Sequence, residues 1–300
     1  MRNSKNLAFA PVIKWSGSKR HVAQVLSKLV PNANRYFEPF VGGGAMLPFR
    51  KITNGVASDI IPELIALWEA IKTNPEQTAY EYQIRWERLQ TEGYQVYYEV
   101  RNNFNKTKNA FDFLFLTRTC VNGLIRYNEK GEFNNSFHLT RPGIKPKTLT
   151  NLILKWSGYL KDIIFLNIDY RETLEAVTRN DFVFLDPPYG GTKDRYTRSD
   201  FDLYTFYKQL DMLNTIGAKW LLTFDGFAGN REYSYEVPKE IYQHKIFIKT
   251  GNSPFTKMMK TTVDAVYESV YFNFDPSTGL PTQVSCQNDQ KLALFSHFDM

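Results

Sequence analysis

Cysteine is almost absent from this 300-residue sequence, which contains only Cys120 and Cys286. No Cys-x-x-Cys pair occurs, which excludes a thiolate zinc site and fits the reducing cytoplasm, where we expect the protein to be located. Histidine is also scarce, and its four copies lie far apart without the spacing of metal ligands: His21, His138, His244 and His297. We therefore expect a protein that binds no metal.

Long apolar runs are missing as well. No segment approaches the length needed to cross a bilayer and no signal peptide is visible, so we expect no membrane association. Hydrophobic residues nevertheless make up 43% of the chain. This fraction allows one sizeable core that carries an inserted subdomain.

The glycine patterns of two common nucleotide sites are missing too. Residues 36–41 are predicted to form a strand that runs into a loop of three glycines at 42–44. Leu47 stands where the third glycine of the dinucleotide fingerprint would fall, and no Gly-Lys-Ser/Thr follows as in a P-loop. The glycines still let the backbone approach a ligand closely, and we expect a helix from Met46 to point its N-terminus at that ligand.

The most informative run is Asp-Pro-Pro-Tyr at 186–189, which closes an apolar strand predicted at 182–185. Ligands of open α/β sheets bind at such strand ends. The Asp186 carboxylate and the Pro187 carbonyl, aimed by two rigid rings, can both accept from an exocyclic amine. Tyr189 can stack on the ring that bears this amine. The alternative interpretation is an ordinary strand-end turn.

Two further segments can contribute to the same ligand site. Asp59 follows a short predicted strand, where an acid commonly accepts from ribose hydroxyls, although it can also cap the helix that comes next. Near the N-terminus, residues 14–19 place a flat Trp15 and a cationic Lys19 beside a turn of small residues. The alternative for this segment is a surface loop that leads into a helix at 19–29.

Positive charge is concentrated in one part of the chain. Residues 101–147 hold nine Lys or Arg against three Asp or Glu, and nine minus three equals the net charge of +6 of the whole protein. Such a stretch is typical of proteins that bind a phosphate backbone, although a solvated basic face is the alternative. Interleaved Asn residues favour nucleic acid, because Asn can pair with adenine and Arg with guanine in the major groove.

Together these segments resemble the adenine-specific DNA methyltransferases of the Dam type (D12 class). That family carries Lys-Trp-x-Gly-x-Lys, Glu-Pro-Phe-x-Gly-x-Gly and Asp-Pro-Pro-Tyr in this order, and here they stand at 14–19, 38–44 and 186–189. A fourth stretch, Asn-Gly-Leu-Ile-Arg-Tyr-Asn at 122–128, is similar to the family's DNA-reading hairpin. The resemblance implies site-specific transfer of a methyl group from S-adenosylmethionine to the N6 amine of an adenine that is flipped out of duplex DNA.

The resemblance also implies roles for single residues. Those that hold the adenine and act in catalysis would be Asp186, Pro187 and Tyr189. The cofactor S-adenosylmethionine would be bound by a larger set: Trp15, Lys19, Phe40, Gly42, Gly44, Asp59, Asp169 and Asp186. The chemistry agrees, because the adenine amine attacks poorly until two acceptors favour a tetrahedral nitrogen, and this requires only positioning and electrostatics.

The basic stretch would then recognise DNA. Contacts with bases or phosphates are expected from five residues: Arg118, Asn122, Arg126, Asn128 and Lys130. GATC is the target sequence that the family suggests, but Val121 replaces a Tyr that inserts into the DNA stack, and Ser136 takes the place of a Pro. The expected partners are double-stranded DNA and, in a restriction–modification system, a cognate restriction endonuclease. We expect the protein to act as a monomer.

The expected fold is α/β, with a Rossmann-like methyltransferase sheet interrupted by a mainly helical target-recognition domain. The catalytic domain is expected at 1–73 and 160–275, the inserted domain at 74–159 and a C-terminal tail at 276–300. Strands are expected at 36–41, 55–58, 163–168, 182–185, 220–224, 242–248 and 263–274, and helices at 19–29, 62–72 and 203–216. The family fold implies that the last strand is antiparallel to the others.

Three other functions remain open from the sequence. A related methyltransferase that acts on RNA or on a protein amide is one, although the basic insert favours a nucleic acid. An NAD-dependent enzyme is disfavoured by the glycine spacing. A DNA-binding module with an inactive site is disfavoured by the intact motif at 186–189.

Overall fold

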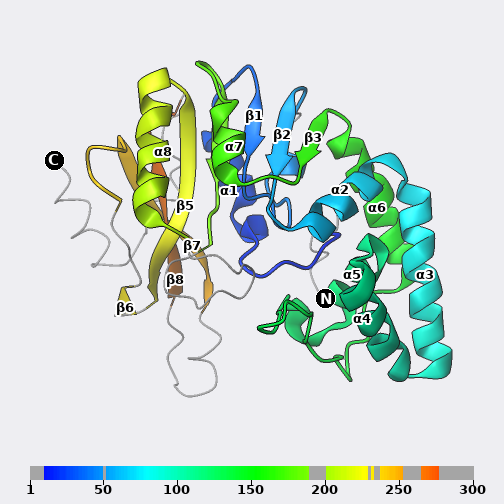
Figure 1. Ribbon diagram of the computed structural model, residues 1–300. Coiled ribbons are helices and arrows are strands. Elements are labelled where there is room, and N and C mark those ends of the chain that lie inside the picture. The colour runs from blue at the N-terminus through cyan, green and yellow to red at the C-terminus, as the bar shows by residue number, and fades with distance from the viewer. Residues whose placement is uncertain are drawn as a thin grey trace, which may run out of the picture.

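The computed structural model describes residues 10–49, 52–188, 201–228, 231–232, 237–252 and 265–276. Its centre is one sheet whose strands run in the order β3-β2-β1-β4-β5-β8-β7, with β6 paired to β5 (Figure 1). The strands are β1 (Tyr36–Glu38), β2 (Gly55–Ser58), β3 (Ile163–Leu166), β4 (Phe182–Leu185), β5 (Lys219–Ala228), β6 (Arg231–Glu232), β7 (His244–Asn252) and β8 (Ala265–Phe272).

The strand directions agree with the expected α/β class. Strands β1 to β5 pair in parallel, whereas β8 is antiparallel to both of its neighbours, β5 and β7. The expected antiparallel last strand is therefore confirmed. From β1 the chain moves outward to β2 and β3 and then returns to β4 on the other side of β1. Open α/β sheets bind ligands where the strand order reverses in this way.

The local sequence explains where the central strands begin and end. All four residues of β4 are buried, and a strand buried on both faces must be apolar along its whole length, as Phe-Val-Phe-Leu is. β1 ends at Glu38 instead of at residue 41, because Pro39 has no N–H with which to continue the ladder. The early end of β1 leaves residues 39–44 free to form a loop above the sheet.

Helices cover both faces of the sheet (Figure 1). One hydrophobic cluster joins the strands to α1 (Ala23–Leu29), α2 (Pro62–Thr73) and α6 (Pro146–Leu160). A second cluster joins them to α7 (Tyr170–Glu175) and α8 (Leu203–Ile216). The result is a three-layer α/β/α arrangement in which the carboxyl ends of β1, β2 and β4 share one edge.

The segment between α2 and β3 is helical, as expected, and lies beyond the β3 edge of the sheet (Figure 1). It contains α3 (Pro75–Glu92), α4 (Gln95–Thr107) and α5 (Ala110–Thr119), and then η4 (Val121–Gly123). Backbone bridges from Cys120 to Phe137 and from Tyr127 to Phe133 form the expected hairpin. One core cluster runs from the sheet into these helices, so the inserted part does not have a separate core.

Two of the expected helices differ from the structure. The helix at 19–29 starts as the 3-10 turn η2 (Lys19–His21), and α1 follows after Val22. The prediction of a helix from Met46 is wrong, because the described residues there form only the 3-10 turn η3 (Leu47–Phe49). Pro48 has no N–H to donate, and the chain must reach β2 within a few residues. Among the residues that the structure describes, no helix is long and apolar enough to cross a membrane.

Candidate active site

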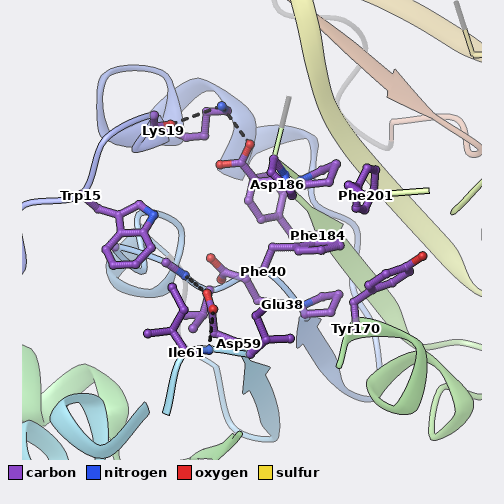
Figure 2. A pocket seen from close by; sticks show the side chains of 18 of the residues that line it. Trp15, Lys19, Glu38, Phe40, Asp59, Ile61, Tyr170, Phe184, Asp186 and Phe201 are labelled. Carbon is purple, nitrogen blue, oxygen red and sulfur yellow. Dashed lines mark hydrogen bonds and ion pairs between the residues drawn. The ribbon is translucent and has the colours of Figure 1, made fainter. Parts of the chain in front are cut away.

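A cavity of about 360 Å³ lies at the carboxyl ends of β1, β2 and β4 (Figure 2). Trp15 stands on one side of it, Tyr170 and Phe201 on the other, and Asp186 and Asp59 at separate positions along its wall. Eight of the residues expected from the sequence line it: Trp15, Lys19, Phe40, Gly42, Asp59, Asp169, Asp186 and Pro187. Residues 15–19, 38–43 and 186–188 therefore line one cavity, although the third segment lies more than 100 residues beyond the other two.

An ionic cluster surrounds the motif aspartate. Asp186 follows β4, and its Oδ1 lies 2.8 Å from Nζ of Lys19 and accepts from the Thr223 hydroxyl at 3.0 Å. The same Lys19 ammonium lies 2.8 Å from Oε1 of Glu268, which comes from β8. Sequence analysis did not select Glu268. The signal that could have identified it is a charged residue within a strand that is otherwise apolar and aromatic except for Ser269.

Burial changes the acidity of the carboxyl groups in this cluster. It raises the pKa of Asp186 to about 6, although the Lys19 cation acts in the opposite direction. It raises the pKa of Glu38 to about 8, because a hydrogen bond from the Tyr36 hydroxyl offsets only part of the desolvation. At neutral pH, Asp186 is therefore mostly an acceptor carboxylate, while Glu38 is mostly protonated.

Asp59 holds the glycine loop in place. Its Oδ2 accepts from the amide of Gly42 at 3.1 Å, and its Oδ1 accepts from the amide of Ile61 at the start of α2 at 3.2 Å. The Gly42 carbonyl in turn accepts from the Trp68 indole at 3.0 Å. The alternative interpretation of Asp59 as the cap of α2 is wrong, because the N-cap is Ile61, whose backbone amide donates to Asp59, and Asp59 faces the cavity. Burial raises its pKa to about 6.

The indole of Trp15 packs directly on the glycine loop. A Cβ atom at Gly42 would lie 2.7 Å from Trp15 Nε1, and one at Gly43 would lie 2.9 Å from Trp15 Cβ. Gly44 differs from the expectation, because it does not line the cavity. A Cβ there would lie 3.0 Å from Trp68, on the core side of the loop, where Gly44 has a φ of +59°. Gly43 takes its place in the cavity wall.

Aromatic side chains and a helix cap complete the wall. Phe40 stacks on Tyr170 with 5.1 Å between ring centroids and meets the edge of Phe201 at 6.0 Å. Asp169 is the N-cap of α7, and its carboxylate accepts from the Arg171 amide at 2.9 Å. Asp169 therefore lines the cavity, but its carboxylate already stabilises the first turn of α7.

The structure changes the interpretation of two residues that we expected to contact DNA. Arg118 is buried, with 6% of its surface exposed, and it donates to the Pro11 carbonyl at 2.7 Å. Burial lowers its pKa to about 10. The Asn128 side chain accepts from the amides of Lys130 and Glu132, which builds the hairpin turn. We therefore propose structural roles for Arg118, which is buried, and for Asn128, whose side-chain oxygen forms the hairpin turn.

The other expected DNA contacts remain accessible. Asn122, Arg126 and Lys130 are exposed on the hairpin region. Arg126 donates to the Asn134 side chain at 2.9 Å, and this contact orients its guanidinium. Tyr189, the aromatic of the motif, lies outside the described residues.

The N-terminal segment connects the hairpin with the cavity. The Lys14 side chain lies against Gly123, where a Cβ would come within 2.8 Å of it, while the adjacent Trp15 lies on the glycine loop. Further upstream, the Ala10 carbonyl accepts from the Trp156 indole at 3.0 Å. The positions of the hairpin and of the cavity wall are therefore physically linked through a few consecutive residues.

Comparisons with known proteins agree with this geometry. Residues 15–257 match the profile of the D12 class N6 adenine-specific DNA methyltransferase family. Type II methyltransferase M.MjaIII of Methanocaldococcus jannaschii is 33% identical over 197 residues, which is 57% of this chain and 66% of that protein. The DNA adenine methylase of Vibrio cholerae is 33% identical over 129 residues (42% and 46%), and that of Escherichia coli is 34% identical over 140 residues (44% and 48%).

The matched segments thus span between about half and two thirds of these relatives. The family profile, in contrast, includes most of the present chain and all three segments that meet at the cavity. On this evidence the chain belongs to the D12 class of N6 adenine-specific DNA methyltransferases.

Proposed function

We propose that the protein transfers a methyl group from S-adenosylmethionine to the N6 amine of adenine within a short sequence of double-stranded DNA. The observation that supports this most directly is the Asp186 carboxylate at the end of β4, held by Lys19 and Thr223 at the wall of a cavity. GATC stays a proposal for the target sequence, as does a cognate restriction endonuclease as a partner and a monomer as the active form.

The cavity fits S-adenosylmethionine by its chemistry. Flat aromatic side chains suit the adenine ring of the cofactor, and Asp59 at the end of β2 suits its ribose hydroxyls. Around Lys19, two carboxylates meet one ammonium, so the cluster has an excess of negative charge that favours a cation. When bound, the cofactor supplies an electrophilic methyl group on a positively charged sulfur.

The residues of the chain position and activate the amine. Lys19 and Thr223 both contact Oδ1 of Asp186, and we propose that Oδ2 accepts from the exocyclic N–H of adenine. The Pro187 carbonyl is the proposed second acceptor. Two acceptors draw the nitrogen lone pair out of conjugation with the ring, and the proton that leaves the nitrogen passes to solvent. The adenine must leave the duplex stack to reach this cavity.

The proposed DNA-binding surface is the exposed hairpin region with Asn122, Arg126 and Lys130. The basic stretch at 101–147 supplies the positive charge for a phosphate backbone. We propose residues 74–159 as the target-recognition part of the molecule, with residues 1–73 and 160–275 as the catalytic part.

The direct test is methyl transfer from S-adenosylmethionine to unmethylated duplex DNA, with modified positions identified by single-molecule sequencing. We expect modified adenines in one short motif. If the protein binds the cofactor but leaves duplex DNA unmodified, the acceptor is wrong, and RNA and protein amides are tested next. If it does not bind the cofactor, the proposed reaction itself is wrong.

Substitution of Gly43 by alanine is expected to weaken cofactor binding. The added Cβ would lie 2.9 Å from Trp15 Cβ, so the indole must move away from the cavity wall. Overpacking of this kind costs about 1–3 kcal/mol, which corresponds to a roughly 5- to 150-fold increase in Kd. Titration calorimetry with S-adenosylmethionine measures this change. Gly158→Ala is the matched control, since a Cβ at Gly158 meets nothing within 4 Å.

Substitution of Arg126 by alanine is expected to relax sequence specificity. Arg126 is exposed and oriented by Asn134, so it can reach a base edge in the major groove. If it contacts a guanine, its loss reduces discrimination by about 1–3 kcal/mol. The measurement compares methylation rates on the target site and on sites with one changed base pair. Unchanged discrimination would refute the assignment, and Lys130→Ala serves as a control that removes charge from the same hairpin.

A further inference from the structure

Glu268 is the charged group of the cluster that neither the motifs nor the proposed mechanism uses. It lies on β8, opposite Gly226 of β5 and Ile248 of β7, and only 9% of its surface is exposed. A buried carboxylate is costly unless it is paired, and the partner here is the Lys19 ammonium at 2.8 Å. Apart from the buried Ser269, the other residues of β8 are apolar or aromatic, so an apolar residue at position 268 would also fit the strand.

Lys19 is shared between two carboxylates. Its ammonium has three N–H donors, and these face Asp186 at 2.8 Å, Glu268 at 2.8 Å and the Gly17 carbonyl at 3.3 Å. Figure 2 shows the Lys19 side chain directed toward Asp186. If Glu268 were neutral, the ammonium would interact with Asp186 alone and would withdraw more of its negative charge.

We propose that Glu268 is a positioning residue for methyl transfer, which shares Lys19 with Asp186 and so keeps the Asp186 carboxylate a strong acceptor for the adenine amine. This role rests on the proposed function. In this arrangement, Lys19 fixes the orientation of Asp186 through Oδ1. Glu268 limits how far the Lys19 cation neutralises the Asp186 carboxylate. Thr223 supports the same orientation by donating to Oδ1 at 3.0 Å.

Each charged or polar side chain that faces Asp186 shifts the pKa of its carboxyl group in a definite direction. The Lys19 cation of η2 lowers its pKa, the Glu268 anion of β8 raises it, and the Thr223 hydroxyl of β5 lowers it. Glu38 of β1 also faces Asp186, whose charge raises the pKa of Glu38. Removing the charge of Glu268 should therefore lower the pKa of Asp186, so that Asp186 stays ionised to a lower pH but accepts a hydrogen bond less strongly.

The test is the pH dependence of methyl transfer to target duplex DNA by the full-length protein. For Glu268→Gln we expect kcat to fall by about tenfold at neutral pH, with KM for S-adenosylmethionine within about twofold of wild type. The acidic limb of the pH profile is expected to move to lower pH. Glu268→Asp, which keeps the charge on a shorter side chain, should restore part of both effects. Glu175→Gln removes an exposed acid from α7 and is the matched control, which should behave as wild type.

The other outcomes overturn the role. If Glu268→Gln loses the same fraction of kcat at every pH and also has a lower melting temperature, Glu268 only stabilises the fold. Wild-type kinetics in Glu268→Gln would leave the proposed function intact and remove this residue from it. If Glu268→Gln does not fold, Glu268→Met decides, because it also removes the charge at a similar side-chain length, and an unmoved acidic limb in that variant refutes the proposal. If the wild-type protein methylates no DNA, the proposed function fails first, and the role of Glu268 fails with it.

Discussion

Replacing Asp186 with alanine is expected to abolish methyl transfer, lowering kcat by about 10²- to 10³-fold or more. The carboxylate is the charged acceptor at the carboxyl end of β4, and alanine leaves the adenine amine conjugated with its ring. Duplex DNA binding should stay close to wild type, because the exposed residues of the hairpin are untouched. Transfer of a labelled methyl group measures the first effect, and fluorescence anisotropy with a target duplex measures the second.

Two further variants make this result specific. Asp186→Asn keeps the size of the side chain and part of its hydrogen bonding, so a comparable loss of kcat would show that the negative charge is needed. Asp211→Asn changes an exposed aspartate on α8 and should leave kcat unchanged. Turnover near wild type in Asp186→Ala would refute the proposed role of the carboxylate.

Replacing Glu38 with glutamine is expected to stabilise the protein at pH 8 by about 2–4 kcal/mol. Burial raises the pKa of Glu38 to about 8, so folding at this pH favours a protonated side chain that is ionised in the unfolded chain. Glutamine is neutral at every pH and can still accept from the Tyr36 hydroxyl. Denaturant unfolding at a series of pH values measures the difference between the two proteins.

The sign of this pH dependence follows from proton linkage. The folded protein binds a proton at Glu38 more tightly than the unfolded chain does, so this contribution to stability is present below the ordinary pKa of glutamate and is lost as pH rises through about 8. The two proteins should therefore differ least near pH 4. A stability difference that is the same at pH 4 and pH 8 would contradict the expected protonation. Glu175→Gln, at an exposed position, should show no such trend.

Most of the strands could be predicted from residue pattern, because burial on both faces demands a continuous apolar run. β2 and β4 begin and end at the predicted residues, and so does the amphipathic helix α8. The end of β1 and the missing helix after Met46 depend on single prolines and on how soon the chain must return to the sheet. The periodicity of hydrophobic residues does not reflect these local constraints.

The surface roles were harder to predict than the cavity. Arg118 carries a charge and lies in a basic stretch, but α5 packs it inside the protein against the Pro11 carbonyl. Asn128 precedes Glu-Lys-Gly, a sequence that is typical of a turn. In the structure its side chain accepts from the amides of Lys130 and Glu132, which forms that turn. A charge count over a segment does not say which side chains face solvent.

By itself, the sequence determined the family, the mainly parallel sheet with its antiparallel last strand, and the three segments that meet at the cavity. Each of these follows from short-range order: apolar runs, glycine and proline positions, and the spacing of motifs. Only the tertiary structure decided which charged side chains form ion pairs. The contact between Lys19 and Glu268 joins residues at opposite ends of the chain, and it exists because β8 is placed beside β5. Such a contact has no local pattern, since it depends on distance in space and on burial.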